Sequence, residues 1–367
     1  MSEKQCLNGN ATTNACKLDN PNFGNNIKRR NKKNLIAILI CFVLLLSFTF
    51  GVCCTASLLH DSKTATGTIK FDIVNWRSLT FDNATWEQVQ YVAEHYGQVG
   101  MPTWHVGDTK QIRIYDTASY ATAGNTTYSR THTVRIADIQ SGRYTISGVA
   151  TNGKGKSSGT TNMVFELAEP IKLVSTDTNS LGVWQTSMNS TNTDTNGWAG
   201  AELQTTLNSS SGSGIFGRLQ TDLQAVIPKV KVHSTIGNAT WELVTSSNYV
   251  SNRLFLPAAC NVTKLSNFYD DEEAINVYGS EDYNFYMMGK TEEGLLYQYY
   301  SDDTDAIRKK TYVNKDNGNN YTVTPQWWLR TPYLDQAIGA FLYVASTGIV
   351  QTYYASYKFT VSFCWAM

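Results

Sequence analysis

The hydrophobic pattern divides the chain into one apolar run near its start and a long remainder of short alternating segments. Residues 35–52 are strongly apolar, and no charged side chain occurs from Leu35 to Leu59. About 20 such residues are enough to cross the hydrocarbon core of a bilayer. Five basic residues within 28–33 precede the run, so the positive-inside rule predicts a cytoplasmic N-terminus.

This arrangement predicts a single-pass protein of the cell membrane whose main domain is extracellular. We divide the chain into a disordered basic cytoplasmic tail (1–34), a transmembrane helix (35–57), a linker (58–83) and an ectodomain (84–367). A cleaved signal peptide is the alternative interpretation. The long basic region and the weak cleavage signal near Cys54 favour the uncleaved anchor.

Alternating apolar and polar positions predict that the ectodomain consists mostly of short strands, with a few helices. Thr85 and Gln88 form a capping box ahead of an apolar helical face, which predicts the start of a helix. Shorter helices are expected at 199–207 and 217–227, and residues 140–142 fit the turn of a hairpin. The predicted class is α+β, in which early and late strands pair. The expected strands are 68–74, 111–115, 133–139, 143–149, 163–167, 171–174, 229–233, 253–256, 327–330, 340–345, 350–354 and 359–363.

The stretch from Gln326 to Pro332 has the composition of a strand in a hydrophobic core. It contains two adjacent tryptophans, Trp327 and Trp328, followed by Leu329 and Arg330. We expect the guanidinium of Arg330 to be buried and to donate hydrogen bonds to loop carbonyls or to a carboxylate. The alternative is that Arg330 is a cation that binds a ligand.

Several blocks of the sequence, taken in order, resemble a bacterial surface-protein domain family of unknown function. They are Trp104–Ile112, Met188–Trp198 and Trp327–Pro332, and the last is similar to the family's Trp-Trp-Leu-Arg-Ser-Pro hallmark. The similarity covers about residues 84–367, although Thr360–Phe363 departs from the family's closing Gly-Val-x-Pro pattern. It implies a C-type-lectin-like fold, akin to formylglycine-generating-enzyme-like domains, and an exported location, but no reaction. The residues expected to serve the structural core are Trp104, Gly107, Asp108, Trp198, Trp327, Trp328 and Arg330.

Composition and charge exclude some classes of function. Only 16% of the residues are charged, against about 25% in a typical protein, so Asn, Thr, Ser and Tyr supply the polarity. The tail at 1–34 has seven basic and two acidic residues, which leaves the remainder of this neutral chain mildly acidic. An acidic domain is a poor candidate for binding nucleic acid. Of seven cysteines, only Cys260 and Cys364 lie in the predicted ectodomain, and they either pair or are buried as thiols.

The sequence contains no convincing metal or cofactor site. None of the five histidines has a His or Cys neighbour at metal-ligand spacing. The acidic runs at 270–273 and 302–305 lack the spacing of a calcium loop, so we interpret them as solvated loop faces. Asp108 is expected to cap the turn at Gly107 rather than bind a metal. We therefore predict neither a metal nor a cofactor.

Tyrosines near the C-terminus suggest a binding surface, because tyrosine gives a large contact area at low entropic cost. We predict a membrane-anchored binding or adhesion module that recognises an extracellular glycan or protein. The alternative is an extracytoplasmic enzyme, either a hydrolase or a formylglycine-generating-type oxidase, that uses His105, His233 or the Cys260–Cys364 pair. The predicted ligand-binding residues are Tyr333, Asp335, Tyr353, Tyr354 and Tyr357.

Overall fold

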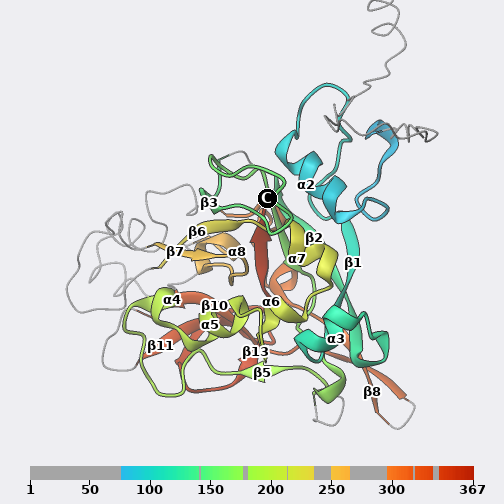
Figure 1. The fold of residues 1–367 in the computed structure, drawn as a ribbon. Helices are drawn as coiled ribbons and strands as arrows, with labels where there is room; N and C mark the ends of the chain where they lie inside the picture. Colours follow the sequence, from blue (N-terminus) through green and yellow to red (C-terminus); the bar gives the residue numbers. More distant parts are fainter. Residues whose placement is uncertain are drawn as a thin grey trace, which may run out of the picture. The chain divides into compact units, whose positions relative to one another are not determined.

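A four-stranded antiparallel sheet joins the early strands of the domain to its last strand (Figure 1). We call it the first sheet; its order is β1-β2-β4-β14. β4 is buried along its whole length, because β2 and β14 pair with its two edges. The strands are β1 (Thr109–Tyr115), β2 (Ser129–Ile139), β4 (Met163–Leu167) and β14 (Cys364–Ala366).

The computed structural model describes eight stretches of the chain, all within the compact unit Asn75–Met367. The other unit, Met1–Val74, contains the predicted tail, anchor and first strand and lies outside the described residues. Within the stretches that are described, no helix combines the length and apolar character needed to cross a membrane. The described stretches are 76–139, 142–176, 181–212, 214–234, 249–264, 296–316, 319–333 and 339–367.

The second sheet has five strands in the order β12-β11-β10-β13-β5. β10 and β11 are buried, because neighbouring strands flank both of them, whereas β12 is an exposed edge strand. β10 runs antiparallel to β11 and parallel to β13. The strands are β5 (Gln185–Thr186), β10 (Trp327–Pro332), β11 (Ala340–Val344), β12 (Val350–Tyr354) and β13 (Phe359–Thr360).

The remaining described strands form two smaller sheets, and their pairing differs from one prediction. The predicted hairpin across 133–149 is wrong, because β3 pairs with β6 rather than with β2. Both edges of β2 are already occupied, by β1 and β4. The three-stranded sheet has the order β3-β6-β7, and β8 and β9 form a separate hairpin. The strands are β3 (Ile146–Gly148), β6 (Lys229–His233), β7 (Tyr249–Asn252), β8 (Tyr312–Asp316) and β9 (Asn319–Val323).

Helix α2 (Trp86–Glu94) begins where the capping box predicts it. The Gln88 N–H donates to Thr85 Oγ1 at 3.2 Å, and the Thr85 N–H donates to Gln88 Oε1 at 2.7 Å. The other helices are short. They are η1 (Trp76–Ser78), α3 (Ala118–Ala123), η2 (Thr126–Tyr128), η3 (Val174–Thr176), α4 (Gly197–Gly200), α5 (Glu202–Asn208), α6 (Ile215–Arg218), α7 (Thr221–Val226), α8 (Ala259–Val262), η6 (Gln298–Tyr300) and α11 (Asp305–Arg308).

Tertiary hydrogen bonds divide two of the predicted helices. The predicted helix at 217–227 is interrupted at Gln220, whose N–H donates to the Arg113 carbonyl at 3.2 Å. The Gln220 side chain also accepts from the Arg113 N–H at 2.8 Å, so β1 holds this residue outside both α6 and α7. The predicted helix at 199–207 is likewise divided into α4 and α5, because Ala201 has extended backbone angles. Mixed helix and sheet confirm the α+β class.

Three predicted strands also differ from the structure. Residues 253–256 follow β7 rather than forming a strand, because Asn208 Oδ1 accepts from the N–H groups of Arg253 and Leu254 at 2.8 and 3.0 Å. Residues 171–174 enter the short helix η3. Of the predicted strand at 359–363, only Phe359–Thr360 forms a strand, β13, and Cys364–Ala366 after it forms β14 in the other sheet.

The core extends into residues that the sequence assigns to the linker. Phe81 is buried, and its ring stacks on Phe165 of β4 at 5.6 Å between centroids. The indole N–H of Trp104, also buried, donates to the Leu79 carbonyl at 2.8 Å. Residues 76–83 therefore fold with the domain.

Buried charges occur in pairs across the first sheet. Glu166 on β4 accepts hydrogen bonds from Arg135 on β2 at 2.6 Å and from Lys310 at 3.1 Å. Tyr300 donates to the same carboxylate at 3.0 Å. Burial alone would raise the pKa of Glu166, but Arg135 and Lys310 hold it below its ordinary value. Glu166 is therefore ionised and fully paired inside the core.

His132 on β2 is a buried neutral group. Its Nε2 accepts from the Lys172 N–H at 2.8 Å, which leaves the proton on Nδ1, where it is donated to the Arg130 carbonyl at 3.1 Å. Burial, and then the charge of Lys172, lower the pKa of His132 from 6.5 to about 3. Protonation would break the bond from Lys172, so the imidazole is neutral throughout the neutral and mildly acidic range.

We predict that His132 makes the fold sensitive to acid. As pH falls from 7 to 5, His132 becomes protonated in the unfolded state but stays neutral in the folded state. The free energy of unfolding therefore falls by about 2 kcal/mol. Urea denaturation of His132→Gln should show a correspondingly smaller loss over this range. His105→Gln, at an exposed histidine, is the control and should match the wild type. Equal pH dependence of wild type and His132→Gln would contradict the assignment.

Candidate functional site

The outer hairpin of the second sheet, β11–β12, places aromatic and amide side chains on one face. Tyr343 is paired with Gln351, and Phe341 is paired with Tyr353. Because directly paired residues project to the same side of a sheet, Tyr343, Gln351 and Tyr353 share a face. The Tyr343 hydroxyl donates to Gln351 Oε1 at 2.8 Å, which leaves the amide nitrogen of Gln351 to act as a donor.

Five rings form what we call the aromatic surface: Tyr343, Tyr353, Tyr354, Tyr357 and Phe359. Tyr353 lies 4.5 Å from Tyr357 and 5.6 Å from Phe359 between ring centroids, and Tyr343 stacks on Phe359 at 4.3 Å. Tyr353, Tyr354 and Tyr357 are 39%, 47% and 50% exposed. The surface therefore offers large exposed rings that are already packed against one another.

A buried tryptophan supports the aromatic surface from below. Trp328 packs on Phe359 at 4.6 Å and on Tyr343 at 6.3 Å between ring centroids. Its indole N–H donates to the Thr186 carbonyl of β5 at 2.9 Å. Since Trp328 is fully buried and hydrogen-bonded, the exposed rings rest on a fixed base.

A groove of about 480 Å³ lies beside these rings. None of the lining residues that the structure describes is charged, so the polarity of this part of the groove comes from hydroxyl and amide groups. Burial, with Tyr353 nearby, raises the pKa of Tyr343 above its ordinary value, so its phenol stays protonated. The lining residues are Tyr333, Leu342, Tyr343, Val350, Gln351, Thr352 and Tyr353.

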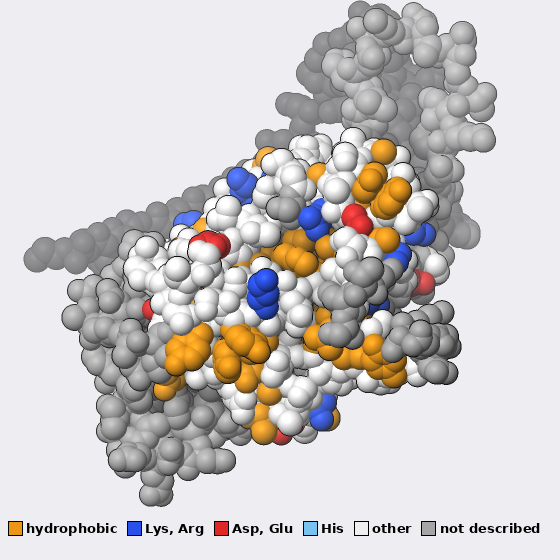
Figure 2. Space-filling model, turned by 90° about the horizontal axis from the view of Figure 1, so that it is seen from below, with side chains coloured by type: hydrophobic (Ala, Val, Ile, Leu, Met, Phe, Trp, Pro, Cys, Tyr) orange, Lys and Arg blue, Asp and Glu red, His pale blue; other side chains and the backbone are white. Residues whose placement is uncertain are grey.

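One face of the described part of the molecule carries several hydrophobic clusters with a few charged side chains between them (Figure 2). Figure 2 shows the underside of the view in Figure 1, toward which β5, β11 and β13 lie. Hydrophobic side chains, tyrosine included, gather there in several clusters among uncharged polar ones. Such a face suits an uncharged partner better than a strongly charged one.

The turn between β11 and β12 is fixed by an arginine from another segment. Arg308 Nε donates to the Gly348 carbonyl at 2.8 Å, and its guanidinium forms ion pairs with Asp303, at 2.7 Å, and with Asp305. Gly348 has a φ of +98°, and a Cβ there would overlap the Asp305 carbonyl. Only glycine therefore fits this position without a shift of the backbone.

A second support comes from the loop before α4. Asn192 Oδ1 accepts from the Ser356 hydroxyl at 2.5 Å and from its N–H at 3.3 Å. The Asn189 N–H donates to the Ala355 carbonyl at 3.1 Å. Ala355 and Ser356 lie between the exposed tyrosines Tyr354 and Tyr357, so this loop holds the turn that presents them.

Four of the five predicted ligand-binding residues lie around this hairpin. Tyr333 and Tyr353 line the groove, and Tyr354 and Tyr357 are exposed beside it. Asp335 lies outside the described residues. The predicted set does not include Tyr343, Gln351 or Phe359. The two-residue period from Gln351 to Tyr353 could have revealed the shared face.

The residues expected to serve the core lie elsewhere. Trp198 is fully buried, and its indole N–H donates to Asn252 Oδ1 at 2.9 Å. Trp327 is also fully buried, and its indole N–H donates to the Arg308 carbonyl at 3.1 Å. Arg330 is buried, and its Nη1 donates to the Leu256 carbonyl at 2.8 Å. These contacts join separate segments of the chain and leave Arg330 away from solvent.

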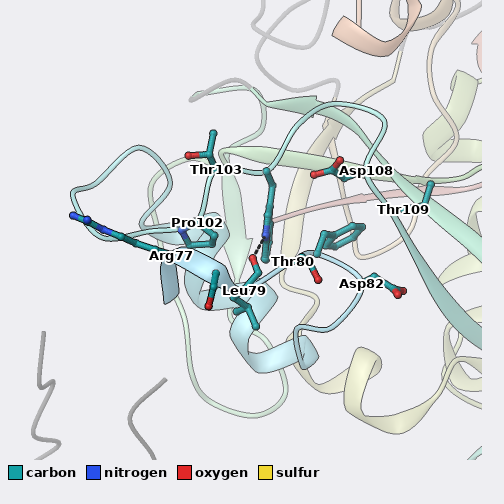
Figure 3. A pocket seen from close by; sticks show the side chains of 11 residues that line it. Arg77, Leu79, Thr80, Asp82, Pro102, Thr103, Asp108 and Thr109 are labelled. Atoms are coloured by element: carbon teal, nitrogen blue, oxygen red, sulfur yellow. Dashed lines mark hydrogen bonds between the residues drawn. The ribbon is translucent and has the colours of Figure 1, made fainter. Parts of the chain in front are cut away.

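The block at Trp104 borders a smaller pocket of about 290 Å³. The His105 N–H donates to Asp108 Oδ2 at 2.9 Å, so the carboxylate caps the turn at Gly107. Asp82 and Asp108 lie on one side of this pocket, and Arg77 points away from both (Figure 3). The pocket therefore presents separated charges rather than a convergent set of groups.

The residues named for the enzyme alternative are spread across different environments. His105 is exposed on its turn, whereas His233 is buried against Tyr249. Burial, and then Arg330, lower the pKa of His233 to about 4. Cys260 and Cys364 are both buried and do not form a disulfide with each other. Within the described stretches, no three His, Cys, Asp or Glu side chains are grouped to hold a metal ion.

The chain matches one protein family, described as a domain of unknown function (DUF6273), over residues 171–362. This range, slightly more than half of the chain, includes the loop before α4, β10 and the aromatic surface. The block at Trp104–Ile112 lies before it. No curated protein and no solved structure matches the chain.

We predict that Gly348→Ala destabilises the hairpin more than an equivalent change elsewhere. Gly107 is the matched control, because its φ of +94° is similar but a Cβ there meets nothing within 4 Å. Gly107→Ala should cost about 1–2 kcal/mol of backbone strain. Gly348→Ala should cost on the order of 3 kcal/mol or more, because the Asp305 backbone must also move. Equal losses of unfolding free energy in urea would show that the contact with Asp305 does not constrain the turn.

Proposed function

This chain belongs to the DUF6273 family of domains of unknown function, and from that premise we propose that it is a cell-surface module that binds an uncharged glycan. The observation that carries the proposal is the aromatic surface, with three exposed tyrosines beside an uncharged groove. Exposed aromatic rings that pack on a buried base are costly to leave in water unless a partner covers them.

The chemistry of the groove favours a sugar. A pyranose ring has an apolar C–H face that can lie on tyrosine rings, and its edge carries hydroxyls that need hydrogen-bond partners. Gln351 offers an amide, and Tyr343, Tyr353 and Thr352 offer hydroxyls. Among the described residues, no charged side chain lines the groove, so these residues offer no ion pair to a sulfated or acidic ligand. A neutral glycan therefore uses the polar groups without burying an unpaired charge.

The location and the fold class are further parts of the proposal. The apolar run at 35–57, with basic residues before it, supports a membrane anchor and an extracellular domain. The blocks at Met188–Trp198 and Trp327–Pro332 support a C-type-lectin-like fold. An anchored module of this kind would hold a glycan or glycan-bearing surface close to the cell.

The enzyme alternative has less support in the described residues. A histidine with a pKa near 4, such as His233, is a weak base at neutral pH. Burial raises the pKa of the Cys364 thiol well above its ordinary value, which disfavours the reactive thiolate. Neither residue lines the groove.

We predict that the exposed tyrosines contribute directly to glycan binding. An array of neutral glycans probed with the full-length chain should show binding that falls about tenfold in Tyr353→Ala and in Tyr357→Ala, the loss expected for about 1.4 kcal/mol of aromatic contact. Tyr128→Ala is the control, because Tyr128 is 40% exposed and lies outside the groove. The proposal fails if the wild-type chain binds no neutral glycan, or if Tyr128→Ala weakens binding as much as the other two changes.

A further inference from the structure

The loop before α4 contains a buried carboxylate in which one oxygen has no hydrogen-bond partner. Asp194 is only 5% exposed, yet its Oδ2 has no hydrogen-bond partner. Three other buried carboxylates among the described residues, Asp138, Glu166 and Asp303, each form an ion pair with an arginine or lysine at 2.6–3.1 Å. Asp194 forms no ion pair with any described residue. Asp194 therefore differs from these three buried carboxylates in having no ion-pair partner among the described residues.

An ionised carboxylate in this position is energetically costly. Removing a charge from water without a counter-charge costs several kcal/mol in general. A cation taken from solution would supply the missing counter-charge.

The sequence around Asp194 has the spacing of a cation-binding loop. Asn192, Asp194 and Asn196 occupy alternate positions and are followed by Gly197, as in the first six positions of a calcium loop, with asparagine in place of the first aspartate. Asn196 and Gly197 have φ values of +64° and +54°. The chain therefore turns sharply at the place where such a loop turns.

The loop differs from a tight calcium loop in its charge. The twelfth position is Leu203 instead of glutamate, and the nearby Glu202 accepts from the Ser190 hydroxyl at 2.6 Å and from its N–H at 3.1 Å. One carboxylate and several neutral oxygens remain available. Fewer charged ligands give a weaker site, in the range of about 10⁻⁴–10⁻³ M that extracellular modules use.

We propose that the loop Asn192–Gly197 binds a calcium ion weakly, with Asp194 as its charged ligand. The amide oxygen of Asn196 and backbone carbonyls of the loop supply further ligands, and water completes the set, because calcium takes six to eight oxygens. Asn192 keeps its bonds to Ser356. A site of this kind, with one carboxylate, is distinct from the three-residue acidic or thiol groups that are absent from the described residues.

The site would act on the aromatic surface through contacts already described. Asn192 holds Ser356, and Gly339 lies so close to Asn192 that an added Cβ would overlap its carbonyl. Calcium would therefore stiffen the turn that carries Tyr354 and Tyr357. This effect on the turn rests on the proposed glycan function, whereas calcium binding itself does not.

The test is thermal unfolding of the full-length chain, first treated with chelator and then titrated with CaCl₂. We expect the unfolding midpoint to rise, with half of the change near 10⁻⁴–10⁻³ M, roughly the range of extracellular calcium modules. MgCl₂ should have a smaller effect, because Mg²⁺ dehydrates reluctantly. In Asp194→Asn the calcium-dependent rise should disappear, while the midpoint without calcium should increase because a buried charge has been removed.

Asp302→Asn is the matched control, because Asp302 is exposed, and it should keep the calcium response. The proposal is overturned if the wild type does not respond to calcium up to about 10 mM, tenfold above that range. It is also overturned if Asp194→Asn responds like the wild type, or if NaCl of equal ionic strength reproduces the rise. These readouts require no glycan. A calcium response without glycan binding would thus separate the two proposals.

Discussion

The carboxylate of Glu166 is the charge on which the first sheet depends. It lies on a strand with no exposed residue and receives hydrogen bonds from Arg135 on β2 and from Tyr300 and Lys310 of one later segment. An anion in this position is tolerable only because every neighbour is a donor. Removing one partner of a buried pair generally costs about 3–5 kcal/mol, since the other charge is left unpaired. The sheet and the segment at 300–310 are therefore stable only together.

The same segment connects the first sheet to the candidate site. The Lys310 ammonium lies 4.8 Å from the ring centroid of Trp327 on β10, and the Arg308 carbonyl accepts from the indole of that tryptophan. Arg308 also holds the turn at Gly348. Two buried cations, Arg308 and Lys310, thus link the core of the first sheet to the outer hairpin of the second sheet. Exposed aromatic rings on such a support lose little freedom when they bind.

The sequence predicts the bounds of an element well where neighbouring residues determine them. It predicts them poorly where hydrogen bonds to distant segments determine them. The capping box of Thr85 and Gln88 and the limits of β12 follow from neighbouring residues alone. The predicted hairpin at 133–149 fails because β6, about 80 residues later, takes β3 as its partner. Gln220 and Asn208 end or prevent regular elements through bonds to remote backbone groups, and no local pattern signals such bonds.

The candidate site shows the same division. A concentration of tyrosines indicates a surface near the C-terminus, but only the pairing of β11 with β12 places Tyr343, Gln351 and Tyr353 on one face. Asp194 passes unnoticed in an Asn/Thr-rich stretch, because its burial and its lack of a partner are properties of the folded chain. The sequence shows which residues carry charge, but not which of those charges are buried in the folded chain.

The position of β14 has a consequence for how the domain is made. Residues 364–366 pair with β4, and the Met367 carbonyl accepts from the Asn162 N–H at 2.7 Å, a closure between segments about 200 residues apart. Before residues 364–366 have been synthesised, one edge of β4 lacks its partner strand and Glu166 is only partly enclosed. Contacts so distant in sequence make folding slow. During that interval the unpaired edge of β4 is open to pairing with other chains, so aggregation competes with folding.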